Sequence, residues 1–220
     1  MTQLETEIHL LKNEVINMWN LVRSQLMKAR ASMLNFDKDL AREVVLKERR
    51  VNGSELKIDR DCENIFALLT PVAVDLRFVL AVLKINSNLE RIGDIAEGIA
   101  KHILNVEAPF KKELLEATYV MKMYDEAIII LEDTLSAFEN EDTILARKVF
   151  KKDEFLDDIN LKANKLIENY LKEHPEDIDQ ALYILSVIRK LERVGDQSKN
   201  ISEEIIFYLE AKVLKHKHYH

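Results

Sequence analysis

Residues that break or turn a chain are scarce in this sequence. Its 220 residues include only four glycines and three prolines, and aromatic side chains make up 7% of the total. With so few turns, the elements between them must be long. Charged residues reach 32%, and leucine, isoleucine, glutamate, lysine and alanine are abundant. This composition is typical of long amphipathic helices and argues against β-sheets.

Other absences narrow the functional class. The single cysteine, Cys62, excludes an internal disulfide framework and a four-cysteine zinc site. The formal net charge is −7 and the basic residues are interleaved with acids, so we expect no nucleic-acid partner. No uncharged apolar run approaches ~20 residues, and the first residues lack the pattern of a signal peptide. We therefore expect a cytoplasmic protein without membrane insertion, whose acidity suits cations or a basic partner.

Five breaks divide the chain into six long segments. They lie near residues 35–37, 69–71, 107–109, 140–142 and 173–175. Three contain proline, which disfavours helix in the residue before it. Each segment has apolar residues at helical spacing, and Asp37 and Asp142 are predicted N-caps. Long helices joined by short loops pack antiparallel.

The second half of the chain repeats the first. Residues 75–103 align with residues 177–205 without a gap, and the run L-E-R-[IV]-G-D recurs in both. Two copies are a duplication and too few for a solenoid. We predict an all-α fold of two tandem antiparallel three-helix bundles, residues 1–107 and 108–220, packed end to end or side by side.

In the third and sixth segments, two acids four positions apart continue a row of apolar residues. The apolar residues are Leu76, Leu80 and Leu83 in the third segment and Ile178, Leu182 and Leu185 in the sixth. The acids are Glu90 and Asp94 and, in the second copy, Glu192 and Asp196. Side chains four apart lie on one face of a helix, so each pair points the same way. We predict that both rows face the core of their bundle.

The second and fifth segments also carry acids in their apolar rows. Glu48 lies in the second and Asp153 in the fifth, followed four residues later by Asn52 and Asp157. Neighbouring helices bring these side chains to the acids of the third and sixth segments. Like charges on a partly dry surface need neutralising, and a cation is one solution. Carboxylate and amide oxygens are hard ligands, suited to Mg, Ca, Mn or Fe.

Ordinary ion pairing is the alternative interpretation of these acids. Arg77, Arg91, Arg189 and Arg193 are close in sequence. The acids recur at matching positions of the two halves, which favours metal binding over ordinary ion pairing. Gly93 and Gly195 within the acidic turns indicate either close approach of a backbone or ligand, or simple helix packing. No histidine belongs to these motifs: His9, His102 and His174 lie elsewhere, and His216, His218 and His220 are interpreted as a solvated tail.

The paired acidic motifs, together with P-V-A-V-D-L-R from Pro71 to Arg77, resemble the PhoU family over essentially the whole chain. The resemblance implies a cytoplasmic, commonly dimeric regulator of phosphate uptake that is not an enzyme. Such a protein negatively regulates the phosphate-starvation response through the phosphate ABC transporter ATPase and a phosphate-sensing histidine kinase.

The resemblance also implies multinuclear metal clusters, with iron expected and manganese, magnesium or zinc as alternatives. Carried over by position, the metal ligands are Glu48, Glu90 and Asp94 in the first bundle and Asp153, Asp157, Glu192 and Asp196 in the second. No catalytic residue is assigned.

Asn52 departs from the family pattern, because an acid is expected there. Either Glu55, one turn along, compensates for it, or the first site lacks one ligand and binds metal more weakly. Two further functions stay open. Carboxylate-bound metal can generate a nucleophilic hydroxide, as in a metal-dependent phosphohydrolase, and a structural scaffold would need the acids only as ion-pair partners.

Overall fold

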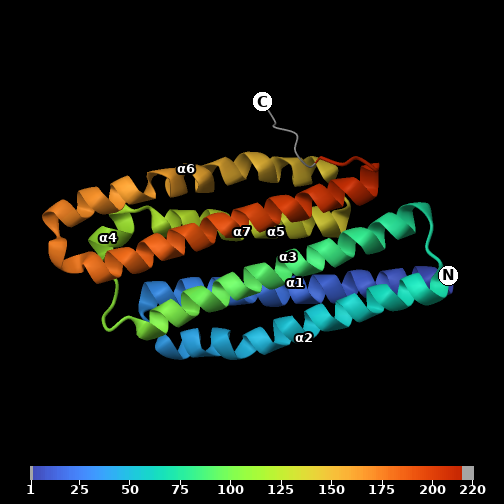
Figure 1. The fold of residues 1–220 in the computed structure, drawn as a ribbon, viewed down its shortest axis with the longest axis horizontal. Coiled ribbons are helices and arrows are strands. Elements are labelled where there is room, and N and C mark those ends of the chain that lie inside the picture. Colours follow the sequence, from blue (N-terminus) through green and yellow to red (C-terminus); the bar gives the residue numbers. More distant parts are fainter. Residues whose placement is uncertain (1, 215–220) are drawn as a thin grey trace.

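The computed structural model describes residues 2–214, which form seven α-helices and one short 3-10 helix, with no strand in that range. The first bundle contains α1 (Gln3–Asn35), α2 (Lys38–Leu69) and α3 (Ala73–Asn105), and the second contains α4 (Lys112–Ala117), α5 (Val120–Asn140), α6 (Thr143–Glu173), η1 (Pro175–Asp177) and α7 (Ile178–Glu210). The prediction of two tandem three-helix bundles is confirmed. They lie side by side, with α3 and α7 between them (Figure 1). The predicted histidine tail, residues 216–220, lies outside the described residues.

Both predicted N-caps are confirmed. The Asp37 carboxylate accepts a hydrogen bond from the backbone N–H of Leu40 at 2.9 Å, where α2 begins. At the start of α6, Asp142 accepts from the N–H groups of Ile144 and Leu145, at 2.8 and 2.9 Å. These contacts satisfy donors that have no partner within the helix. None of the described helices is long and apolar enough to cross a membrane.

The fourth segment, predicted as a single helix, is broken in two. The short α4 ends at Ala117, and Tyr119 takes a left-handed conformation with φ 55° before α5 begins. The prediction was wrong because neither glycine nor proline marks the break. Thr118 and Val120 are β-branched and Tyr119 is aromatic, so three weak helix formers stand in a row. At the C-cap of α4, the Thr118 hydroxyl donates to the backbone oxygen of Leu114 at 2.8 Å.

The two bundles share one hydrophobic core. Phe78 of α3 packs against Phe138 of α5 and Tyr208 of α7, with ring centroids 6.2 and 5.4 Å apart. On α1, the Trp19 indole N–H donates to the backbone oxygen of Leu131 in α5 at 3.3 Å. The buried apolar side chains of both halves form one continuous cluster. The predicted boundary near residue 107 falls between α3 and α4, but as a boundary between domains it stays a prediction.

The apolar rows predicted for the second and fifth segments are buried, as expected for core-facing rows. The rows predicted for the third and sixth segments are not. Leu80 of α3 and Leu182 of α7 remain 39% and 57% exposed. The buried row of α3 instead includes Val79, Val82 and Leu89. Because α3 and α7 pack against helices on more than one side, apolar residues occupy most of their faces, and spacing alone did not identify the innermost row.

Candidate metal centre

The first acidic cluster lies where α2 packs against α3. Glu48 projects from α2 and is only 4% exposed. Gly93 of α3 makes room for it, since a Cβ atom at position 93 would lie 3.1 Å from Glu48 Oε1 and 3.1 Å from Val51 Cγ1. The glycine in the L-E-R-[IV]-G-D run therefore permits a carboxylate of the neighbouring helix to approach the α3 backbone.

Glu48 is buried beside the Gln25 amide and has no cationic partner within residues 2–214. Neither of its carboxylate oxygens has a hydrogen-bond partner within the described residues. Burial raises the pKa of Glu48 to about 7; the nearby Gln25 amide opposes this shift, and the negative charges of Asp94, Glu97 and Glu90 add to it. An ionised carboxylate in such a place costs free energy unless a cation or hydrogen-bond donors compensate it. The donor set therefore fits a hard cation.

The remaining predicted ligands of this cluster are more open to solvent. Glu90 is half-buried and Asp94 is exposed, and the pKa of Glu90 is raised by burial first and then by Asp94. Asn52 is exposed. Glu55 is half-buried, and its pKa is raised by burial and by the charges of Asp59 and Asp94. Glu55 thus lies in the electrostatic field of the cluster, and both explanations of Asn52 remain open.

The second cluster repeats this geometry between α6 and α7. Asp153 of α6 is 1% exposed and takes the place of Glu48. Its partner glycine is Gly195, where an added Cβ would overlap the Asp153 carboxylate and lie 2.8 Å from Leu156 Cδ1. Asp153 Oδ1 has no hydrogen-bond partner within the described residues. The same pairing of a buried acid with a facing glycine therefore occurs in both bundles.

A lysine distinguishes the second cluster from the first. Lys199 Nζ lies 2.5 Å from Asp153 Oδ2, 2.9 Å from Asp196 Oδ1 and 3.9 Å from Asp157 Oδ2. Burial raises the pKa of Asp153 to about 6, against the opposing effect of Lys199. Glu192 is half-buried, and its pKa is raised by burial and then by Asp196 and Asp157.

Sequence reasoning missed three residues of these clusters: Gln25, Glu97 and Lys199. Ion pairing was weighed with arginines, yet no arginine forms an ion pair with a predicted ligand among residues 2–214, and the cation that does is a lysine. The repeat contained the signal, because the alignment that matches Asp94 with Asp196 also matches Glu97 with Lys199. Gln25 carries a weaker signal, as a polar residue in the buried row of α1.

Comparison with known proteins matches this duplicated architecture. The family model of the PhoU domain matches twice, over residues 15–103 and 120–205. The chain belongs to the PhoU family. A relative from Edwardsiella tarda, named phosphate-specific transport system accessory protein PhoU, is 33% identical over 214 residues, covering 97% of this chain and 87% of the relative. The Escherichia coli K12 protein of the same name is 31% identical, with 97% and 88% covered.

Solved PhoU structures share the fold. The crystal structure of PhoU from Pseudomonas aeruginosa aligns with a TM-score of 0.87 at 28% identity, covering 96% of this chain and all of that one. The phosphate transport system regulatory protein PhoU from Streptococcus pneumoniae also aligns at 0.87, with 29% identity and coverage of 97% and 100%.

A third group of potential ligands in this PhoU chain is already neutralised. Within residues 2–214, three His, Asp or Glu ligand atoms lie within 4.8 Å of one another only at His174, Glu176 and Asp177. Lys111 Nζ lies 2.8 Å from Asp177 and 3.5 Å from Glu176, and the Tyr170 hydroxyl donates to Asp177 at 2.7 Å. The predicted clusters are wider, so metal binding there requires side-chain movement or several bridged ions.

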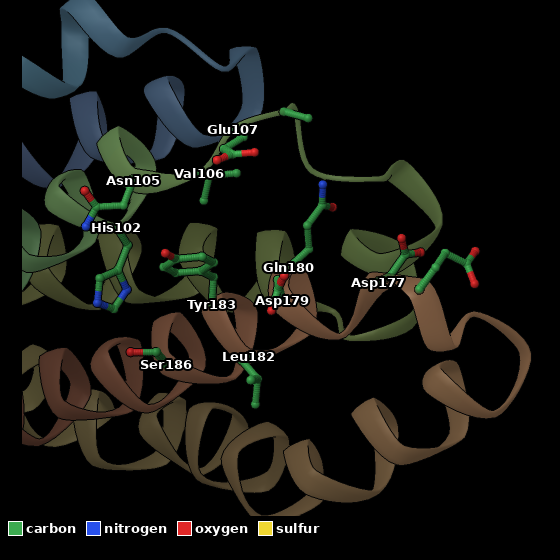
Figure 2. A pocket seen from close by; sticks show the side chains of 12 residues that line it. His102, Asn105, Val106, Glu107, Asp177, Asp179, Gln180, Leu182, Tyr183 and Ser186 are labelled. Atoms are coloured by element: carbon green, nitrogen blue, oxygen red, sulfur yellow. The ribbon is translucent and has the colours of Figure 1, made fainter.

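A cavity of about 680 Å³ lies apart from both clusters, between the end of α3 and the start of α7. Figure 2 shows the rings of His102 and Tyr183 beside each other in it, with centroids 5.5 Å apart. Gln180 closes one side by donating to the Pro109 backbone oxygen at 3.0 Å. Among the described residues that line the cavity there is no lysine or arginine. Glu107 and Asp179 line it in addition to the Lys111-paired acids Glu176 and Asp177, so its charge disfavours phosphate.

Proposed function

We propose that this chain is a non-enzymatic, metal-binding accessory protein that regulates phosphate uptake. The main support for metal binding is the buried carboxylate of Glu48, which has no ion-pair partner within residues 2–214 and lies within electrostatic range of Glu90, Asp94 and Glu97. The phosphate role is supported by relatives named as accessory and regulatory proteins of phosphate transport.

Glu48, Glu90 and Asp94 would hold the cation of the first cluster. A bound cation supplies the positive charge that this cluster lacks, and iron is the proposed metal, with manganese, magnesium or zinc as alternatives. By position, the family resemblance would assign a second set of ligands around Lys199, whose ammonium group already neutralises part of their charge: Asp153, Asp157, Glu192 and Asp196. Carboxylates shared between α2 and α3 would also tie the two helices together once neutralised.

The exposed acids provide the surface for partners. Asp94 and Asp157 are exposed at the two clusters, and an acidic surface suits basic regions of another protein. We propose the ATPase of the phosphate ABC transporter and the phosphate-sensing histidine kinase as partners, in the cytoplasm and with this chain as a homodimer. Binding to them would negatively regulate the phosphate-starvation response.

Elemental analysis of the full chain, purified without added metal, tests the metal proposal. We expect bound metal in the wild-type protein and its loss in Glu48→Gln, which keeps the shape of the side chain and removes its charge. A pull-down from cells grown in high and low phosphate, with the same pair of proteins, tests the partners. Capture of neither the ATPase nor the kinase would contradict the regulatory role, and metal-dependent phosphatase activity lost in Glu48→Gln would favour the phosphohydrolase.

A further inference from the structure

The two clusters differ at one matched position in a way that reverses its charge. Glu97 of α3 aligns with Lys199 of α7 in the repeat. Glu97 is near enough to Glu48 to raise its pKa, whereas Lys199 forms an ion pair with Asp153, the counterpart of Glu48. Around Glu48, the first cluster therefore has the carboxylates of Glu90, Asp94 and Glu97. The second cluster has four carboxylates and the ammonium group of Lys199; the carboxylates are those of Asp153, Asp157, Glu192 and Asp196.

Lys199 is placed where a bridging cation would be expected. Its Nζ atom contacts a carboxylate oxygen from each of the two helices, Asp153 of α6 at 2.5 Å and Asp196 of α7 at 2.9 Å. The lysine is about three-quarters buried, which strengthens its interaction with the carboxylates relative to an exposed ion pair. A divalent ion bound between the same oxygens would have to displace the ammonium group into solvent.

In the first cluster, no lysine or arginine among residues 2–214 forms an ion pair with Glu48, and the lysine that pairs with Glu97, Lys101 at 2.6 Å, is 55% exposed. Lys190 of α7, whose Nζ lies beside Gly98, is within electrostatic range of Asp94. Among the described residues, Lys190 forms no ion pair with the first cluster, and both oxygens of Glu48 remain unpartnered. The acids of the first cluster, in the first bundle, are therefore the ones that need a cation from solution.

We infer that Lys199 serves as a built-in cation in the second cluster, so that this chain binds divalent metal in the first cluster alone. The inference rests on the proposed metal-binding function and specifies where in the chain it operates. The ammonium group of Lys199 and a divalent ion compete for the same carboxylate oxygens, and the lysine has the advantage of being part of the chain. The first cluster then needs a metal ion to neutralise its acids, whereas the second cluster is neutralised without one.

Exchanging the two matched residues tests the inference. Full-length wild type, Glu97→Lys, Lys199→Glu and Glu48→Gln would be stripped with chelator and dialysed against Mn²⁺, and bound manganese would be counted by elemental analysis. We expect nearly complete loss of manganese in Glu48→Gln and Glu97→Lys. Lys199→Glu should roughly double the bound manganese, because it opens the second cluster with an additional carboxylate. Circular dichroism would verify that each variant is folded.

The outcomes separate this inference from the function on which it rests. If Glu48→Gln and Glu97→Lys keep about half of the wild-type manganese, the second cluster binds metal despite Lys199, and the inference is wrong while metal binding stands. If a folded Lys199→Glu gains none, the lysine does not exclude metal. No manganese in wild type or any variant would instead remove the proposed metal function. Should Lys199→Glu fail to fold, the metal remaining in the two first-cluster variants still decides.

Discussion

Glycines 93 and 195 accommodate side chains of the neighbouring helices. A glycine inside a helix lowers stability relative to alanine by up to ~1 kcal/mol. At these two positions the missing Cβ leaves space for Glu48 and Asp153. Gly53 of α2 differs, because no atom of residues 2–214 outside its own helical turn lies within 4 Å of the place where its Cβ would be. The three glycines therefore allow one substitution to be compared in three environments.

Alanine at these positions should have opposite effects on the free energy of unfolding. Gly53→Ala should stabilise the protein by ~0.5–1 kcal/mol, since only the helix propensity changes. Gly195→Ala should destabilise it by ~1–3 kcal/mol, because the new methyl group overlaps Asp153 and crowds Leu156. Gly93→Ala should lie between them. Urea denaturation measures all three, and stabilisation by Gly195→Ala would show that α6 and α7 are not in close contact there.

Glu48 should give the metal-free protein a characteristic pH dependence. Its pKa rises from an ordinary value of 4.5 to about 7 in the folded state. Between these values the unfolded chain releases the proton while the folded one retains it, so stability falls as the pH rises through this window and levels off above it. We expect a loss of ~1–3 kcal/mol.

Urea denaturation from pH 4.5 to 8, in the presence of chelator, measures this loss. Glu48→Gln should flatten most of the slope, because the amide does not titrate. Asp153 remains in both proteins, so its own titration cancels in the comparison. An unchanged slope in Glu48→Gln would mean that the Glu48 carboxylate is solvated in the metal-free state.

At the scale of helices, the sequence predicted which helices exist and where they begin better than it predicted which face of each helix is buried. Apolar spacing and the capping residues Asp37 and Asp142 identified long helices and their beginnings, since both signals are local. The break at Tyr119 was not predicted because no glycine or proline marks it. The inner faces of α3 and α7 were misassigned because tertiary packing on several sides decides which apolar row is buried.

The cap of α6 should contribute measurably to stability. Asp142→Ala removes the acceptor for two backbone N–H groups and should cost ~1 kcal/mol. The control is Asp158→Ala in the same helix, which removes only an exposed ion pair with Lys162 and should cost less than ~0.5 kcal/mol. Thermal or urea unfolding distinguishes them. Equal losses would mean that the cap contacts do not stabilise α6.

At the scale of the whole molecule, the internal repeat could not predict that the two bundles share one hydrophobic core. Internal similarity predicted two copies, but similarity between copies says nothing about the surface that joins them. The residues at that junction, Trp19, Phe78, Phe138 and Tyr208, lie outside the repeated acidic run. The acids of the two clusters could be predicted because they recur, and Lys199 was missed because the first copy has Glu97 at the matching position.

Phe138→Ala should weaken both bundles together. The Phe138 ring is fully buried and packs against Trp19, Phe78 and Tyr208, so its removal should cost ~3–5 kcal/mol. Unfolding should remain a single transition, with coincident changes in tryptophan fluorescence and helical circular dichroism. Phe155→Ala on the partly exposed face of α6 is the control and should cost much less. Two separated transitions would show that the bundles unfold independently.

The connection between the bundles is short and open to solvent, whereas the surface that joins them is buried. Residues 107–109 and Lys111 are exposed between α3 and α4, so this stretch is the natural place for a protease to cut. Because α3 and α7 hold the halves together along their length, such a cut would not release them (Figure 1). A nicked chain would give two fragments on a denaturing gel and still migrate as one particle in native chromatography.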